Sequence, residues 1–263
     1  MSSPLFVEDM DWQERPDGVK VFRRRVFARD YFDYKPGQHV VFGGPSTKGK
    51  TTLIFDLLEY CVNSDFQAFL PVSKPQDPVT ARRGEELGFR RVSEWPPSKP
   101  LKEIFGAQKP PGYLIWSQFG DLNTDMQRAS DLTAKVLMER YAHGASKKNK
   151  GGILVMDDTM LKAKVMGLDS QMVTILAMAG AMKIGQWIVV QRPADSGRTT
   201  LWGYEMAEHL FFTKGGDDKM LARYVEIIGE NGPMAKKIIP TLRPFQFLYV
   251  QKSEGFMCIV GAD

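Results

Sequence analysis

Glycine, lysine and threonine recur between residues 44 and 51 at a spacing that suits phosphate binding. Gly44, Gly49, Lys50 and Thr51 satisfy the pattern G-x-x-x-x-G-K-[ST]. Glycines let the backbone curl so that successive N–H groups surround an anion. The lysine can then contact the β- and γ-phosphates of a nucleotide, and the threonine hydroxyl can ligate Mg²⁺. The predicted nucleotide-binding residues are Gly44, Pro45, Ser46, Thr47, Lys48, Gly49, Lys50, Thr51 and Thr52.

The residues on both sides of this loop fit a strand, a turn and a helix. An apolar run from His39 to Phe42 precedes the loop, and an amphipathic run from Thr51 to Cys61 follows it. A helix that starts here adds unpaired N–H groups and the positive end of its dipole to the anion site. A chance turn rich in Gly and Ser is the alternative, but the flanking strand and helix disfavour it.

Two adjacent carboxylates end a second apolar run, which reads GGILVMDD over residues 151–158. Such a run is typical of a central parallel strand that is covered on both faces. If this strand and the phosphate-loop strand are parallel neighbours, Asp157 would hold Mg²⁺, directly or through water. Asp158 would then polarise the attacking water. A strand that simply ends in a polar turn is the alternative.

A glutamine ends the next apolar run, QWIVVQ at residues 186–191. At the carboxyl end of a strand beside the acid-bearing one, Gln191 can hydrogen-bond the γ-phosphate or the lytic water. Ligands of open α/β sheets bind at this edge. Lys74 and Asp77, which follow a predicted strand at residues 66–72, could therefore face the nucleotide or a partner subunit. A plain connecting turn is the simpler interpretation of that segment.

The rest of the chain alternates apolar strands with periodic helices. The residues from 194 to 205, which include Arg198, read as a loop. The last two predicted strands flank Lys252–Gly255 and form a hairpin. Further strands are predicted at 19–26, 113–117, 209–213, 245–251 and 256–261, and further helices at 79–87, 122–141, 168–183 and 217–228.

The 263 residues suit one large α/β domain, with 43% hydrophobic and 25% charged residues. We divide the chain into a basic N-terminal extension, residues 1–36, and an ATPase domain, residues 37–263. Cys61 and Cys258 have no metal-site spacing and imply no disulfide framework, which favours a reducing compartment. The first thirty residues do not form an ordinary secretory signal, and no apolar run approaches the roughly 20 residues of a membrane span.

Basic residues gather at two places, and the net charge of +4 is compatible with nucleic acid without demanding it. Arg23, Arg24 and Arg25 either contact phosphates or lie on a solvated strand edge, and the second interpretation is favoured. The loop from His143 to Lys150 carries three lysines and could equally contact phosphates or face solvent.

The order of these motifs resembles P-loop ATPases that have a strand inserted between the two nucleotide motifs. From IVVQRP at residues 188–193 through HLFFTKGGDDKMLARYVEIIG at 209–229, the chain resembles the FtsK–HerA superfamily. Its members are hexameric DNA-pumping ATPases, including genome-packaging ATPases of membrane-containing viruses and conjugation motors. The resemblance implies an α/β P-loop NTPase fold of the RecA-like (ASCE) type. Its central, mostly parallel sheet would be flanked by helices, with the hairpin at the C-terminal end.

The resemblance also implies roles for individual residues and partners. ATP and Mg²⁺ would be the cofactors: residues 44–51 would bind the nucleotide, Asp157 would serve Mg²⁺, Asp158 would activate water and Gln191 would sense the γ-phosphate. An arginine from a neighbouring subunit would complete the site. The candidates for that arginine are Arg198 and Arg223, with Arg192 behind them.

Double-stranded DNA and further copies of the chain in a ring, a hexamer by this resemblance, are the expected partners. A viral capsid or membrane vertex is a further docking partner to test. The expected location is the cytoplasm, or a virion-associated state in a host cytoplasm. Two other functions stay open: another ATPase with this core (a RecA-like recombinase, helicase or helicase loader), and a slowly hydrolysing scaffold. The family commonly has glutamate where this chain has Asp158, which leaves the scaffold open.

Overall fold

The computed structural model describes residues 12–74, 76–98, 108–117, 122–144, 146, 150–192, 197–215 and 217–261. Within these residues, eleven strands form one sheet in the order β1-β2-β11-β10-β9-β3-β8-β7-β4-β6-β5. The strands are β1 Trp12–Glu14, β2 Lys20–Phe22, β3 His39–Gly43, β4 Ala68–Val72, β5 Arg90–Val92, β6 Gly112–Trp116, β7 Gly152–Met156, β8 Ile184–Val190, β9 Ala207–Phe212, β10 Phe247–Gln251 and β11 Phe256–Val260.

The sheet is parallel through its centre and mixed at one side. All neighbouring strands from β9 to β5 pair in parallel. β10 pairs antiparallel with both β9 and β11, which confirms the C-terminal hairpin. The predicted α/β fold with a mostly parallel sheet is therefore confirmed.

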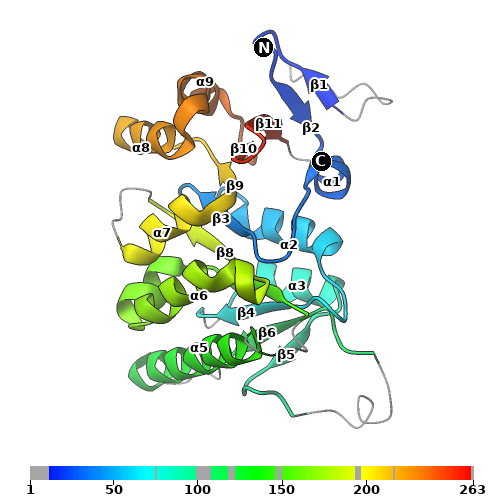
Figure 1. Ribbon diagram of the computed structural model, residues 1–263, viewed down its shortest axis with the longest axis vertical. Coiled ribbons are helices and arrows are strands. Elements are labelled where there is room, and N and C mark those ends of the chain that lie inside the picture. Colours follow the sequence, from blue (N-terminus) through cyan, green and yellow to red (C-terminus); the bar gives the residue numbers. More distant parts are fainter. Residues whose placement is uncertain are drawn as a thin grey trace.

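Helices cover both faces of the sheet (Figure 1). The helical segments are α1 Arg24–Val26, η1 Phe27–Tyr31, α2 Lys50–Cys61, α3 Pro78–Glu86, α5 Leu122–Gly144, η2 Leu161–Val165, α6 Asp169–Met182, α7 Arg198–Met206, α8 Asp218–Ile228, η3 Gly229–Asn231, α9 Gly232–Ile238 and η4 Ile239–Thr241. None of the described helices is long and apolar enough to cross a membrane.

Alternation along β3 shows how the two layers of the core form. Val40 and Phe42 pack with the apolar side chains of α2, whereas Val41 packs in the layer that contains those of α5 and α6. Successive residues of a strand point to opposite faces, so a strand that is apolar throughout is covered twice. This double cover buries every residue of β3, β7 and β8.

Two of the predicted segments differ from the structure over part of their length. The strand expected over residues 19–26 is confirmed at Lys20–Phe22, but a helix begins at Arg24, whose side chain is buried against Asp56 rather than lying on a solvated edge. The loop expected over residues 194–205 becomes α7 from Arg198 onward. Helix α9 was not predicted. Tertiary contacts override short-range pattern in such short segments.

The boundary placed at residue 36 stays a prediction. Within the described residues, β2 pairs in parallel with β11, and Phe22, Phe27 and Phe32 belong to the core layer that also contains Phe42. Residues 20–36 therefore share a sheet and a core with the strands that follow.

Candidate active site

Four adjacent parallel strands end at one edge of the sheet, and each is followed by polar residues of the candidate site. The order is β3, β8, β7 and β4. The phosphate loop follows β3, Gln191 follows β8, Asp157 and Asp158 follow β7, and Lys74 lies two residues beyond β4. The sequence argument required β3 and β7 to be neighbours, which is wrong because β8 lies between them. The acids reach the loop across one intervening strand, and Gln191 does follow the strand beside the acids.

The phosphate loop adopts backbone angles that only glycine accepts easily. Gly44 has φ 142° and Gly49 has φ 82°. A Cβ atom on Gly44 would lie 2.0 Å from Thr213 Oγ1, so any side chain there would collide with the residue that follows β9. The loop geometry thus explains why both glycines stand at these positions.

Lys50 lies across the loop and is buried. Its Nζ donates to Gly44 O at 2.7 Å and to Pro45 O at 2.6 Å. Burial lowers the pKa of Lys50 to about 8, although the charges of Asp157 and Asp158 act in the opposite direction. A cation with only carbonyl partners is incompletely neutralised, and a phosphate group would give it a charged acceptor.

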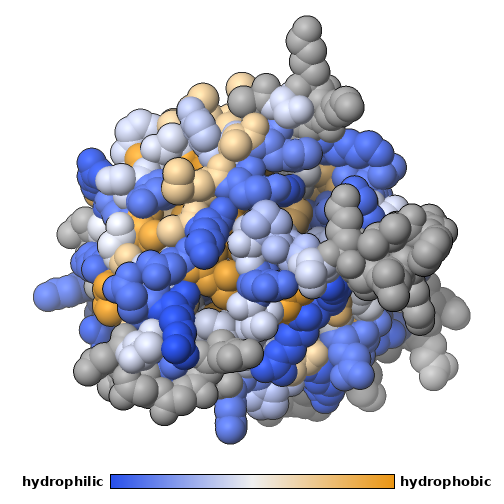
Figure 2. Space-filling model, turned by 90° about the horizontal axis from the view of Figure 1, so that it is seen from below, coloured by the Kyte–Doolittle hydropathy of each residue, from blue (hydrophilic) through white to orange (hydrophobic). Residues whose placement is uncertain are grey.

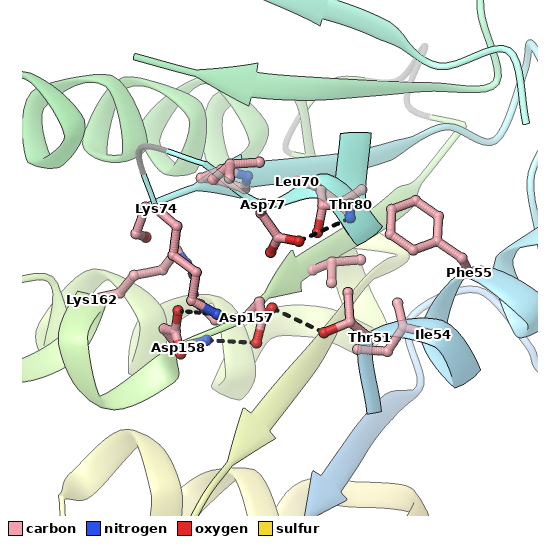
Figure 3. Close-up of a pocket in the computed structure, with 14 residues that line it drawn as sticks. Thr51, Ile54, Phe55, Leu70, Lys74, Asp77, Thr80, Asp157, Asp158 and Lys162 are labelled. Carbon is pink, nitrogen blue, oxygen red and sulfur yellow. Dashed lines mark hydrogen bonds and ion pairs between the residues drawn. The ribbon is translucent and has the colours of Figure 1, made fainter. Parts of the chain in front are cut away.

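Thr51 and Asp157 lie within reach of one shared ligand. Thr51 Oγ1 is 3.3 Å from Asp157 Oδ2, and Figure 3 shows the two side chains pointing toward each other from α2 and from the end of β7. A hydroxyl and a carboxylate are oxygen donors, the type that Mg²⁺ prefers, and Mg²⁺ sites in proteins use few side chains beside waters and phosphates. These two residues therefore fit a nucleotide-bound Mg²⁺.

Asp158 occupies a sharply turned position at the end of β7. Its φ is 51°, and its backbone N–H donates to Asp157 Oδ1 at 2.9 Å. Gln191 Nε2 donates to Asp158 Oδ1 at 3.3 Å, and Lys74 Nζ pairs with Asp158 Oδ2 at 3.0 Å. A non-glycine residue with positive φ is uncommon and is often found at functional sites. The turn presents the Asp158 carboxylate to groups from two neighbouring strands.

Lys74 is part of this cluster, although a connecting turn was the simpler sequence interpretation. Burial acts to lower its pKa, but the charges of Asp157 and Asp158 outweigh that effect, and the net shift is upward. Lys74 stays protonated and reduces the negative charge around Asp158.

Sequence reasoning missed Lys162, which lies on η2. Its side chain is 1% exposed, and Nζ donates to the backbone carbonyl of Asp157. Burial lowers the pKa of Lys162 to about 8, against the opposing effect of the two aspartates. The sequence offered little signal, because MLKAKVM at residues 160–166 carries two lysines and only Lys162 is buried. Lys162 secures the turn that carries both acids (Figure 3).

The phosphate loop and the acids open into a pocket of about 420 Å³. Its lining includes Lys50, Asp157 and Gln191, together with Val79 and Phe245. Ser46, Thr47, Gly49, Thr51 and Thr52 line it as well, while Lys48 is close enough to act on the pKa of Lys50. Figure 2 shows the outside of the molecule from below, where hydrophilic residues cover much of the described surface.

The two leading arginine candidates pair with acids of their own chain. Arg198 Nε lies 3.0 Å from Asp169 Oδ2, and Arg223 Nη1 lies 2.5 Å from Glu226 Oε1. Arg192, by contrast, lines a smaller hollow together with Asp158 and Gln191. The structure therefore brings Lys50, Thr51, Asp157, Asp158 and Gln191 together and leaves Arg198 and Arg223 outside the pocket described above.

The sheet order, the glycine-rich loop and its helix define the fold of the P-loop ATPases. No protein-family model matches the sequence, and no curated protein matches it. Solved structures do match the fold. One is the genome packaging NTPase B204 of Sulfolobus turreted icosahedral virus 2 in complex with AMPPCP, with a TM-score of 0.52, 14% identity, and coverage of 87% of this chain and 98% of that chain.

Two further similar structures come from bacterial proteins. VirB4 of Thermoanaerobacter pseudethanolicus matches with a TM-score of 0.60 and 6% identity, over 86% of this chain and 89% of that chain. The cytoplasmic domain of the type VII secretion ATPase EccC of Thermomonospora curvata matches with a TM-score of 0.57 and 14% identity, over 96% of this chain and 28% of that chain. At these identities the likeness establishes the fold.

Proposed function

We propose that this chain is an ATPase of the FtsK–HerA type that hydrolyses ATP and moves double-stranded DNA. The observation that carries the proposal is the meeting of a phosphate loop, two acids and a glutamine at the ends of β3, β7 and β8. The likeness to a viral genome packaging NTPase, which covers 98% of that protein's chain, supports the translocase class.

Each residue of the cluster has a distinct part in the proposed reaction. The loop N–H groups and Lys50 hold the phosphates, and Thr51 and Asp157 hold Mg²⁺. Bound Mg²⁺ would neutralise charge on the phosphate oxygens. Asp158 accepts a proton from the attacking water, and Gln191, which contacts Asp158 at 3.3 Å, orients that water. Lys74 and Lys162 position the two acids.

We assign the missing positive charge at the γ-phosphate to an arginine of a neighbouring copy in a ring. Arg198 is the leading candidate because its side chain is 64% exposed and its partner Asp169 is also accessible. Arg223 and Arg192 are the alternatives. Of the basic loop proposed to contact DNA, residues 147–149 lie outside the described residues, and Lys150 pairs with Asp65 at 2.5 Å.

The test is ATP turnover by the wild type and by Lys50→Ala, with no DNA, with duplex DNA and with single strands. Stimulation by duplex DNA that disappears in Lys50→Ala is the expected result. Stimulation by single strands alone would indicate a RecA-like enzyme, and nucleotide binding without turnover would indicate a scaffold. Salt-sensitive duplex binding would accompany the expected result, because phosphate contacts release counterions.

A polypeptide cargo is the second candidate, because the secretion ATPase EccC matches 96% of this chain. Turnover that neither form of DNA changes would favour it over DNA.

A further inference from the structure

An aromatic side chain lines the pocket on the β9 side of the phosphate loop, whereas the two acids follow β7 on the other side of it. Phe245 lines the pocket together with Thr47, Gly49 and Thr52, and the residue is 51% exposed. A Cβ atom built on Gly49 would lie 3.0 Å from Phe245 Cδ1, so the ring lies directly against the phosphate loop. An aromatic ring this exposed leaves apolar surface in contact with water, and a ligand could cover that surface.

Strand direction explains why Phe245 reaches this edge. β10 runs antiparallel to β9, with Leu248 opposite Phe212, and β9 runs parallel to β3, with Phe212 opposite Gly43. The segment that enters β10 therefore lies where β9 and β3 end. The turn at residues 243–246 is closed by two hydrogen bonds, Gln246 N to Arg243 O at 3.1 Å and Arg243 N to Gln246 Oε1 at 2.9 Å.

The backbone of Phe245 is held in a rare conformation. Its φ is 64°, in the left-handed region that bulky side chains seldom adopt. Such a conformation persists where surrounding contacts determine it, and these positions gather at binding sites.

Those contacts tie the turn to the helix that binds the phosphates. Arg24 Nη2 donates to Phe245 O at 2.9 Å, and Arg24 Nη1 donates to Asp56 Oδ2 at 3.2 Å. Asp56 belongs to α2, and its other oxygen accepts from Arg83 of α3. Arg24 and Asp56 are both buried. These bonds hold the backbone of the turn that carries Phe245 against α2, the helix that follows the phosphate loop.

We propose that Phe245 is the platform on which the base of the bound nucleotide stacks. This inference rests on the proposed nucleotide site and adds the residue that takes the base. Stacking uses the π-face that every base has, so Phe245 favours the larger purines and accepts both ATP and GTP. The phosphate loop supplies affinity for the triphosphate, and the Arg24–Asp56 pair holds the turn in register with it.

The test compares ATP, GTP and inorganic tripolyphosphate, each with Mg²⁺, as ligands of the full chain in calorimetric titrations. Phe245→Ala is expected to weaken ATP and GTP binding by about 10- to 100-fold, while tripolyphosphate binding changes by about twofold at most. Phe245→Tyr keeps the ring and should bind ATP as the wild type does. Tyr60→Ala, which removes a similarly exposed aromatic near the C-terminal end of α2, is the matched control and should change nothing.

Two results would contradict stacking on Phe245 without contradicting the proposed nucleotide site. One is unchanged ATP affinity in Phe245→Ala, and the other is an equal loss of affinity for ATP and tripolyphosphate. Retained tripolyphosphate binding also shows that the variant is folded. A wild type that binds neither ATP nor tripolyphosphate would overturn the proposed nucleotide site, and the platform with it.

Discussion

Around the acids, polar and charged side chains from α2 and from the segments after β4, β7 and β8 contact one another, whereas on the other side of the phosphate loop one aromatic ring lies on a turn. Lys50 is 6% exposed and Phe245 is 51% exposed. A buried charge without a partner costs several kcal/mol, so the charged side needs many mutually dependent contacts. Stacking needs only a correctly placed surface. The contrast indicates that variants on the charged side affect chemistry, while those at the ring affect affinity for the base.

The largest expected effect belongs to Asp158. Asp158→Asn should keep ATP binding and lower turnover by about 10²- to 10⁴-fold, because the amide cannot accept the proton of the water. Single-turnover hydrolysis alongside calorimetric ATP binding measures both quantities. The matched control is Asp131→Asn, an exposed residue of α5. Unchanged turnover would remove Asp158 from its proposed role and weaken the division between the two sides.

A substitution at Lys162 tests whether its buried charge contributes to ATP turnover or to the stability of the fold. Lys162→Met keeps the length of the side chain and removes a cation whose pKa burial lowers to about 8. We expect turnover to fall about 10-fold or more, because the Asp157 carbonyl loses its donor. The midpoint of thermal unfolding should change little, because removal of the buried charge offsets the cost of the unpaired carbonyl. A large drop in that midpoint, with turnover lost only in proportion to unfolded protein, would make Lys162 a stability residue.

The pH dependence of ATP binding should come from Lys50, beside the site proposed for the phosphates. Burial lowers the pKa of Lys50 to about 8 in the free protein, and a bound phosphate favours its protonated form. The affinity for ATP should therefore be highest below pH 8, where Lys50 is protonated. Above pH 8 it should fall by up to about 10-fold per pH unit. Phe245→Ala should keep this slope and Lys50→Ala should lose it. A slope that survives in Lys50→Ala would assign the titration to another group.

The smallest effect is expected at Lys74, whose side chain is 47% exposed and pairs with Asp158 at 3.0 Å. Exposed ion pairs contribute about 0–1 kcal/mol, so Lys74→Ala should change turnover by no more than about fivefold. Lys35→Ala breaks a comparable exposed pair with Asp33 and serves as the control in the same assay. A loss of 100-fold in Lys74→Ala would place Lys74 in direct contact with the reacting phosphate.

The phosphate loop and the acids were readable from sequence because their residues follow local rules. A glycine-rich turn between an apolar strand and a helix, and acids after an apolar run, are patterns within about a dozen residues. Lys74 was noticed but ranked as a turn residue, and Lys162 was missed, because their roles depend on contacts with Asp158 and Asp157 across the edge of the sheet.

The order of residues by itself determined the loop geometry at Gly44 and Gly49, the strand that Asp157 and Asp158 follow, and the hairpin at the C-terminal end. Only the tertiary structure placed β8 between the two motif strands, buried Arg24 against Asp56 and carried Phe245 to the phosphate loop. The physical reason is the distance along the sequence over which each property is set. Backbone conformation and the spacing of buried residues depend on residues that are close in sequence. The contacts of Arg24 with Asp56 and Phe245 depend instead on strand order and direction, which no local pattern encodes.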